Sequence, residues 1–368
     1  MNSASTVRDF APAHATDDAD APVTRRPFRV LRIGDAVSVR IRVRSAVVCA
    51  ALLAAVVAVG LYTLATGDYS IPVPDVVRAL LGGGDQATHF VVDSLRAPRL
   101  VTGVLVGAAL GASGAVFQSI TRNPLGSPDV IGFGTGSACG AVAVIVLAHG
   151  DAPEVSAGAL AGGLATAAAV YLLALRGGAM QGFRLILVGI GVTGMLTAFD
   201  QWMLTRASIN DAVTAQIWLT GSLNGRGWAQ AVPLAIAVAV LLPCTALLSR
   251  QADLLEMGDD AARALGLRVE RGRLALVVLA VALVAVATAA AGPVTFVALA
   301  APQIARRMTK SPGVGVGPAA AMGALVVPVS DLAAQRLFPS ELPVGVATGA
   351  VGGVYLAFLL ARQWRGGR

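Results

Sequence analysis

Charge is scarce in this 368-residue chain, because Asp, Glu, Lys and Arg together make up only 13% of it. Aromatic residues account for 5%, and Lys310 is the single lysine. A soluble domain carries about 25% charged residues, so a water-covered surface is hard to build from this composition. The scarcity of charge argues against a soluble globular fold.

Residues that serve catalysis and metal binding are also few. Cys49, Cys139 and Cys244 are far apart and fall inside apolar stretches, which argues against a disulfide framework or a zinc site. The three histidines form no cluster in the sequence, so we expect no bound metal. Lys310 lies in RMTKS, which lacks the GxxxxGK pattern of a phosphate-binding loop. We therefore expect neither a cofactor nor an enzyme in its own right.

Long apolar stretches are what the chain has in quantity. Residues 45–66 run for twenty-two positions without a charge, and such a helix is about 33 Å long against a hydrocarbon core of about 30 Å. Similar stretches follow at 98–118, 129–149, 155–176, 184–205, 229–249, 272–291, 293–308, 315–335 and 343–363. The sequence predicts an all-α, polytopic membrane helical bundle of about ten transmembrane helices. Pro293 and Pro302 interrupt the shortest stretch, which leaves open a broken or partly re-entrant segment.

The basic residues give a net charge of +7, but they lie in short loops between spans. The even-numbered loops and the C-terminal end hold fourteen of the 28 Lys and Arg, against six in the odd-numbered loops. Cytoplasmic loops retain positive charge, so we predict a multi-pass protein of the inner membrane with both termini in the cytoplasm. The same distribution argues against a nucleic-acid partner.

Residues 1–44 differ from the rest of the chain. Acidic residues among Ala and Pro precede a basic run over 25–44, with too few bulky apolar residues to bury a core. We predict a disordered basic cytoplasmic tail over 1–44 and a transmembrane domain over 45–368. A cleaved signal peptide is the competing interpretation, but the first apolar run exceeds the about 7–15 residues of a signal's apolar region, and nine more spans follow.

Glycines spaced by four predict close helix packing. They are Gly103, Gly107 and Gly111 in the second span and Gly345, Gly349 and Gly353 in the last. Residues four apart share a helix face, and glycine there lets two backbones approach. Packing within one subunit is the simplest interpretation, so these glycines predict a compact bundle without identifying a dimer face.

The largest loop between spans, about 250–271, predicts two short helices. The sequence breaks at Gly258, resumes as a helix and stops at Gly266. Asp259 and Asp260 open the second helix, where carboxylates complement the helix dipole, and alanines keep this helix narrow. Such a helix suits docking into a partner's groove, and a solvated connector lying on the membrane is the alternative.

Four ordered segments resemble the FecCD family of ABC importer permeases. LEMGDDAARALGL is similar to the family's coupling loop, and RAPRLVTGVLVGAALGASGAVFQSITRNPLGSPDVIGFGTG to its second and third spans. AGPVTFVALAAPQIARR (291–307) and ELPVGVATGAVGGVYL (341–356) are similar to later segments. The resemblance covers residues 45 to about 363. NPLGSPDVIGF, WLTGSLNG and LLEMGDD most resemble the ferric enterobactin permeases of the family.

The resemblance implies a type II importer permease architecture and several partners. These are two ABC ATPase subunits, a homologous permease, a soluble substrate-binding protein and a ferric siderophore. A pair of different permeases is favoured over two copies of one chain. The implied cargo is an iron(III)-catecholate such as ferric enterobactin, with cobalamin and haem as alternatives. ATP hydrolysis belongs to the partner ATPase.

The resemblance also implies site residues. Contacts with the ATPase are implied at Gly258, Asp259, Asp260, Ala262, Leu265 and Gly266. Docking of the binding protein is implied at Arg96, Arg99 and Arg336, because family arginines at matching positions pair with glutamates of that protein. From the residues alone, snorkelling anchors explain these arginines equally well. Gln303 stands where many members carry histidine, so hydrogen bonding remains there and proton transfer does not.

Two other classes of protein compete with a permease. An ion-coupled secondary transporter predicts inverted repeats and buried ion-binding carboxylates, but only Asp200 and Asp331 lie near the spans, toward helix ends. Packing against an outer arginine, or a water-filled vestibule, explains these two residues without ion coupling. A membrane-embedded enzyme needs a convergent cluster of His, Cys or carboxylates within the spans, and the sequence shows none.

Overall fold

The computed structural model describes residues 28–33, 37–67, 69–176, 179–180, 182–311, 313–337 and 342–366. The chain divides into two units, Met1–Val43 and Arg44–Arg368. Each unit is described by itself.

An antiparallel strand pair is the described part of the first unit. β1 (Phe28–Ile33) pairs with β2 (Val37–Arg42). These strands differ from the disorder predicted over 1–44, while 1–27 and 34–36 lie outside the described residues. FRVLRI and VSVRIR alternate apolar with polar or basic residues, which is the period-two pattern of a strand, and this pattern explains the difference.

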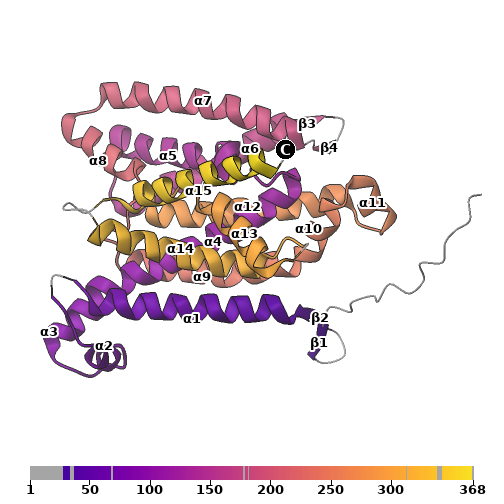
Figure 1. Ribbon diagram of the computed structural model, residues 1–368. Coiled ribbons are helices and arrows are strands. Elements are labelled where there is room, and N and C mark those ends of the chain that lie inside the picture. The colour runs from indigo at the N-terminus through magenta and orange to yellow at the C-terminus, as the bar shows by residue number, and fades with distance from the viewer. Residues whose placement is uncertain are drawn as a thin grey trace, which may run out of the picture. The chain divides into compact units, whose positions relative to one another are not determined.

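The second unit is a bundle of long helices that lie alongside one another (Figure 1). Seven helices among the described residues are long and apolar enough to cross a membrane. They are α1 (Val43–Ala65), α4 (Ala97–Thr121), α6 (Ala152–Ala174), α7 (Gly182–Arg206), α9 (Trp228–Leu247), α12 (Val269–Ala291) and α14 (Val316–Arg336).

Three further segments match the remaining predicted spans. They are α5 (Phe133–Ala143) with its π-helical continuation η3 (Val144–Ala148), α13 (Val297–Thr309) and α15 (Val344–Gly366). α13 has 13 residues, or about 20 Å of helix, which falls short of a hydrocarbon core of about 30 Å. Phe296, just before α13, has a φ of 65°, so the chain turns sharply there. The weakest of the predicted spans is thus a short helix that begins after this turn.

Small elements cover the two ends of the bundle (Figure 1). The end called here the α2 end carries α2 (Val73–Leu80), α3 (Gln86–His89), the π-helical η1 (Phe90–Arg96) and α8 (Ile209–Leu219). The α11 end carries the 3-10 turn η2 (Pro128–Ile131), β3 (Leu175–Arg176), β4 (Ala179–Met180), α10 (Ser249–Glu256) and α11 (Asp259–Ala264). Among these connections, the sequence predicts helices only for the 250–271 loop.

The centre of the bundle is formed by α4, α12 and α14. Val106 and Phe117 of α4 and Leu276 and Leu283 of α12 are all at most 1% exposed. The peripheral helices α1, α7 and α9 instead leave large apolar side chains exposed, among them Met195 at 75%. Because lipid solvates such side chains and polar backbone is satisfied within each helix, these exposed faces suit a membrane or a partner subunit.

α4 and α14 run antiparallel, and their backbones meet. A Cβ atom added to Gly107 would lie 2.1 Å from the carbonyl oxygen of Gly323, and one added to Gly111 would lie 2.2 Å from that of Ala319. Facing pairs step four residues along both helices in opposite directions: Arg99 with Asp331, Gly103 with Val327, Gly107 with Gly323, and Gly111 with Ala319. This close contact lies within one subunit and fixes α14 against α4.

The glycines of α15 make a different set of contacts. A Cβ added to Gly345 would lie 2.0 Å from the carbonyl oxygen of Thr220, whereas one at Gly349 would make an ordinary contact of 3.5 Å with Thr295. One at Gly353 would meet nothing within 4 Å, so the packing predicted there is wrong for the described residues. Gly352 packs on Phe296 instead, because a residue seven positions after Gly345 stays on the same helix face.

Candidate functional site at the two ends of the bundle

The α10–α11 pair projects at the α11 end of the bundle (Figure 1). Gly258 separates the two helices with a φ of 113°, and Gly266 ends α11 with a φ of 83°. Both values lie in the region that glycine adopts most readily, so these two glycines set the shape of the loop. A Cβ atom at either position would meet nothing within 4 Å, which leaves both glycines open to an approaching partner.

The residues predicted to contact an ATPase divide into two groups. The Asp260 side chain is fully exposed and Leu265 is 61% exposed. Ala262 is completely buried and faces the bundle instead. Asp259 also points inward, to two arginines of the spans. Of the residues predicted to contact an ATPase, those that face outward are therefore Asp260, Leu265 and the two glycines.

Asp259 lies between Arg122 and Arg273. Its Oδ1 atom accepts a hydrogen bond from Arg273 Nη2 at 2.7 Å and a second one from Arg122 Nη2. Burial raises the pKa of the Asp259 carboxyl, but the hydrogen bond and charge of Arg273, joined by those of Arg122, outweigh burial and hold the pKa below its ordinary value. The carboxylate therefore stays ionised at neutral pH.

Two further interactions attach α10 to neighbouring helices. Glu256 forms an ion pair with Arg306 of α13. The Asp253 carboxylate accepts a hydrogen bond at 2.8 Å from the backbone N–H of Val314, which precedes α14. Sequence reasoning missed these contacts, since their partners lie 50 and 61 residues away.

Gln303 of α13 also reaches a loop at this end. Its Nε2 atom donates a hydrogen bond to the backbone carbonyl of Pro124 at 2.6 Å. Pro124 belongs to the NPLGSPD segment that follows α4. The hydrogen-bonding role left to this amide by the sequence analysis is therefore present, and it connects α13 to the α4–η2 loop.

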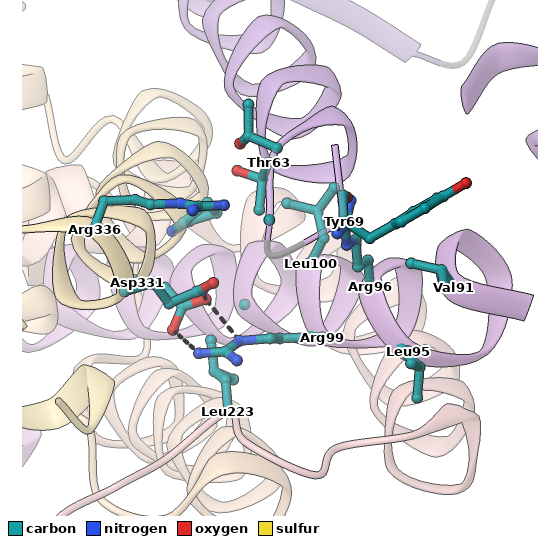
Figure 2. Close-up of a pocket in the computed structure, with 15 residues that line it drawn as sticks. Thr63, Tyr69, Val91, Leu95, Arg96, Arg99, Leu100, Leu223, Asp331 and Arg336 are labelled. Carbon is teal, nitrogen blue, oxygen red and sulfur yellow. Dashed lines mark hydrogen bonds and ion pairs between the residues drawn. The ribbon is translucent and has the colours of Figure 1, made fainter. Parts of the chain in front are cut away.

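A pocket of about 390 Å³ opens at the α2 end, and Figure 2 shows its lining. Arg96, Arg99 and Arg336 all line it, together with Asp331 and Gln335. The structure thus brings the three arginines predicted to dock a binding protein to one pocket between α1, α4 and α14. Their environments within it differ.

Arg99 is engaged within the bundle. Its Nε and Nη2 atoms donate to the two carboxylate oxygens of Asp331, each at 2.9 Å, in the two-pronged arrangement visible in Figure 2. Gln335 donates a third hydrogen bond to Asp331 at 2.7 Å. The side chains of Arg99 and Asp331 are 19% and 6% exposed, so this ion pair is largely buried. Asp331 therefore packs against an arginine, which is one of the two explanations that the sequence left open.

The other two arginines of the pocket, Arg96 and Arg336, differ in their contacts. Arg96 donates to the backbone carbonyls of Leu64 and Tyr69 at 2.7 and 2.6 Å, so it ties the end of α1 and the loop that follows it to η1. Arg336 ends α14 with an exposed side chain. Arg336 is therefore the most accessible of the three to an approaching carboxylate.

The ionisable groups inside the described part of the bundle are few and scattered. Among the described residues, no group of three or more His, Cys, Asp or Glu side chains converges as metal ligands do. Asp200 of α7 is 5% exposed, and its Oδ1 atom has no hydrogen-bond partner in the described part of the chain. The organised polar groups of the bundle lie instead at its two ends.

Apolar helices of membrane length, with polar networks at both ends, define a class of protein: a polytopic helical membrane protein. The chain belongs to the FecCD transport family, whose model matches residues 47–362.

Individual relatives extend over almost the whole family segment. The ferric enterobactin transport system permease protein FepG of Escherichia coli (strain K12) is 47% identical, and the match covers 88% of this chain and 98% of FepG. The achromobactin transport system permease protein CbrC of Dickeya dadantii (strain 3937) is 36% identical, over 84% of this chain and 89% of CbrC. The resemblance to ferric enterobactin permeases drawn from three short motifs is confirmed.

A solved structure matches the fold. It is a metal-chelate type ABC transporter in an inward-facing conformation, with a TM-score of 0.78 and 25% sequence identity. The match covers 86% of this chain and 99% of that chain. The all-helical permease architecture predicted from the sequence is therefore confirmed.

Proposed function

We propose that this chain is the permease subunit of a binding-protein-dependent ABC importer that carries an iron(III)-catecholate siderophore, such as ferric enterobactin, into the cytoplasm. The observation that carries the proposal is the 47% identity to FepG over 88% of this chain. The chain itself hydrolyses nothing: the partner ATPase supplies the energy, and neither a cofactor nor a resident metal is needed.

The charge distribution supports an orientation in the inner membrane. The α11 end carries the arginine-rich loops and is assigned to the cytoplasm, because cytoplasmic loops retain positive charge. α1 begins at this end, where Arg44 Nε donates to the Met308 carbonyl at 2.9 Å. The C-terminus of α15 lies there too (Figure 1). Both termini are thus cytoplasmic, and the basic residues of 1–44 can contact anionic lipid headgroups.

The α11 end is the proposed contact with two ATPase subunits, one for each permease. Asp260 and Leu265 are exposed, and Gly258 and Gly266 have open space beside them. A short helix of this kind fits a groove on a partner, and closure of the ATPase pair then moves the helix.

The α2 end is the proposed contact with the substrate-binding protein. Arg336 is exposed there, and Arg96 and Arg99 line the same pocket. Carboxylates of the binding protein meet Arg336 first, and the positive charge of Arg96 and Arg99 adds to the attraction. Charge complementarity of this type fixes the register of a complex and speeds its formation.

A second permease completes the passage. The peripheral helices leave small residues uncovered, among them Gly191 and Gly194 of α7, which have no atom within 4 Å of an added Cβ. Uncovered glycines allow a second bundle to approach closely. We favour a homologous, different permease as this partner, and two copies of this chain as the alternative.

Transport in reconstituted vesicles tests the proposal. The chain is combined with its homologous permease and ATPase in vesicles that hold ATP on the ATPase side. Accumulation of radiolabelled iron is then measured as ferric catecholate and as ferric hydroxamate, beside labelled cobalamin, with and without the binding protein. We expect uptake of the ferric catecholate that requires both ATP and the binding protein.

Each result separates one part of the proposal from another. Uptake of cobalamin but of neither iron complex would overturn the substrate and keep the ABC permease. Uptake driven by an ion gradient without the ATPase would overturn both. Assembly with a single permease species in the active complex would replace the heterodimer by a homodimer.

A further inference from the structure

α11 is attached to two membrane spans through one carboxylate. Asp259, the first residue of α11, shares its Oδ1 atom between Arg273 of α12, at 2.7 Å, and Arg122 at the end of α4. The Arg273 side chain is only 5% exposed, so its charge needs a partner close by. The carboxylate therefore lies at a junction of three elements, with its charge directed into the protein.

Arg122 is held in an uncommon backbone conformation at this junction. Its φ is 51°, in the left-handed region that arginine rarely adopts. The same side chain donates from Nε to the Leu255 carbonyl of α10 at 2.9 Å. A conformation of this kind persists where surrounding contacts determine it. Arg122 thus binds α10 through a backbone oxygen and α11 through Asp259.

The rest of α10 is bound to the same spans. Ser119 of α4 donates to the Ala252 carbonyl at 2.7 Å, and this serine is 1% exposed. Glu256 pairs with Arg306 of α13. A displacement of the α10–α11 pair is therefore transmitted to the ends of α4, α12 and α13, of which α4 and α12 lie at the centre of the bundle.

Asp260 offers a natural contrast, because it is adjacent in sequence and has the same charge. Its side chain is fully exposed and forms an ion pair at 3.0 Å with Arg263, three residues later on α11. A pair within one helix does not connect that helix to anything else. Of two neighbouring aspartates, one is directed into the bundle and the other to the outside.

We infer that Asp259 is a positioning residue that transmits movement of α11 to α4 and α12, and that it is not a contact for the ATPase. The inference rests on the proposed function, in which α11 receives the ATPase movement. It reassigns Asp259 from the surface that the sequence analysis predicted to meet the ATPase and leaves Asp260 on that surface.

The test compares Asp259→Asn with Asp260→Asn in the complete complex with its ATPase, second permease and binding protein. ATP hydrolysis and iron uptake are measured in the same vesicles. For Asp259→Asn we expect normal co-purification of the ATPase, with iron transported per ATP reduced about tenfold, a factor equivalent to about 1.4 kcal/mol. For Asp260→Asn we expect weaker, more salt-sensitive ATPase association, with the iron-to-ATP ratio unchanged in the complexes that remain.

Three further variants distinguish transmission from misfolding. Asp75→Asn removes one charge from an exposed ion pair at the opposite end and should match the wild-type ratio. Asp259→Glu keeps the charge and should restore part of the ratio. Arg122→Gln, whose side chain is 42% exposed, should lower the ratio, and its loss should combine less than additively with that of Asp259→Asn, since the two residues share one contact while Arg122 also donates to the Leu255 carbonyl.

Loss of ATPase association in Asp259→Asn, with the ratio preserved, would overturn the inference, because it would place Asp259 on the contact surface. Additive losses in the double variant would also overturn it. A wild-type complex that shows no ATP-dependent uptake would instead reject the proposed function, so the two failures are told apart by the wild-type measurement.

Discussion

Each end of the bundle holds an aspartate between helices, but the two aspartates join different things. At the α2 end, Asp331 pairs with Arg99 and connects two long spans, with its side chain 6% exposed. At the α11 end, Asp259 pairs with Arg122 and Arg273 and connects a six-residue helix to two spans, with its side chain 30% exposed. One ion pair joins elements that already touch, and the other attaches an element with little contact of its own.

The comparison of the two ion pairs indicates when an ion pair determines the position of a helix. Eight residues from the Arg99–Asp331 pair along each helix, or about 12 Å away, Gly107 meets Gly323 backbone to backbone. Packing therefore holds α4 against α14 whether or not the ion pair forms. In α11 only Ala262 is fully buried, so apolar burial stabilises its position weakly. There the ion pairs decide where the helix lies.

The largest effect is expected from breaking the packing that underlies the α2 end. Gly107→Ala places a Cβ atom 2.1 Å from the Gly323 carbonyl oxygen, and backbone cannot give way as a side chain can. Overpacking of this type costs about 3 kcal/mol or more, so we expect a large fall in thermal stability in detergent and low yield of folded protein.

Gly191→Ala is the matched control for this variant, because it makes the same chemical change at a helical glycine with open space around it. We expect it to change stability by no more than about 0.5 kcal/mol. Equal loss of stability in both variants would mean that glycine is needed for the helices themselves and not for the α4–α14 contact.

A smaller effect is expected from breaking the ion pair at the α2 end. Asp331→Asn removes the charge that Arg99 binds, and its single amide oxygen cannot accept all three hydrogen bonds that the carboxylate accepts from Arg99 and Gln335. We expect a loss of about 2 kcal/mol in stability, since hydrogen bonds to charged groups are worth about 1.5–3 kcal/mol. Thermal unfolding of the purified chain measures it.

The same variant sharpens the comparison with Asp259. If packing fixes α14, Asp331→Asn should transport the same amount of iron per ATP hydrolysed as the wild type, although it is less stable. Asp259→Asn should instead lower the ratio, and its loss of stability should be limited because Arg273 keeps Glu270 as a charged partner at 3.4 Å. A lowered ratio in Asp331→Asn would show that the α2-end ion pair also transmits movement, and the distinction between the two ends would fail.

The helices themselves could be read from the sequence. Long uncharged runs leave few alternatives to a membrane helix, and Pro293 and Pro302 marked a segment whose helix, α13, is too short to cross. The break at Gly258 and the stop at Gly266 follow from the conformations that glycine allows. The strand pair β1–β2 was missed because the composition of residues 1–44 was weighed above the alternating pattern of these two segments.

The residues that the site residues contact could not be predicted from the sequence. The glycine spacing predicted that Gly107 packs closely, but Gly323 is 216 residues later and no local pattern names it. Arg99 and Asp331 are 232 residues apart, and Arg122 and Asp259 are 137 apart. A charged residue near a helix end looks equally suited to a partner protein, a lipid headgroup or another helix. Only the folded bundle distinguishes Arg99, which is engaged, from Arg336, which is exposed.

The smallest effect on stability, and a specific effect on docking, is expected at Arg336. Arg336→Glu changes an exposed side chain and should shift stability by no more than about 0.5 kcal/mol. Because like charges repel, its affinity for the binding protein should fall about tenfold at low salt. The difference from wild type should shrink as ionic strength rises, because the Debye length falls to about 3 Å at 1 M salt. Binding of the labelled protein to vesicles across a salt series measures both.

Arg78→Glu makes the same charge reversal at the same end of the bundle and separates docking from a general field. Arg78 is exposed on α2, where it pairs with Asp75, and it does not line the pocket of Arg96, Arg99 and Arg336. If the binding protein contacts that pocket directly, Arg78→Glu should weaken binding far less than Arg336→Glu does. Equal weakening would mean that the binding protein responds only to the net charge of the α2 end. In that case contacts with lipid headgroups would explain Arg336, and the residues of the pocket would serve to hold α1, α4 and α14 together.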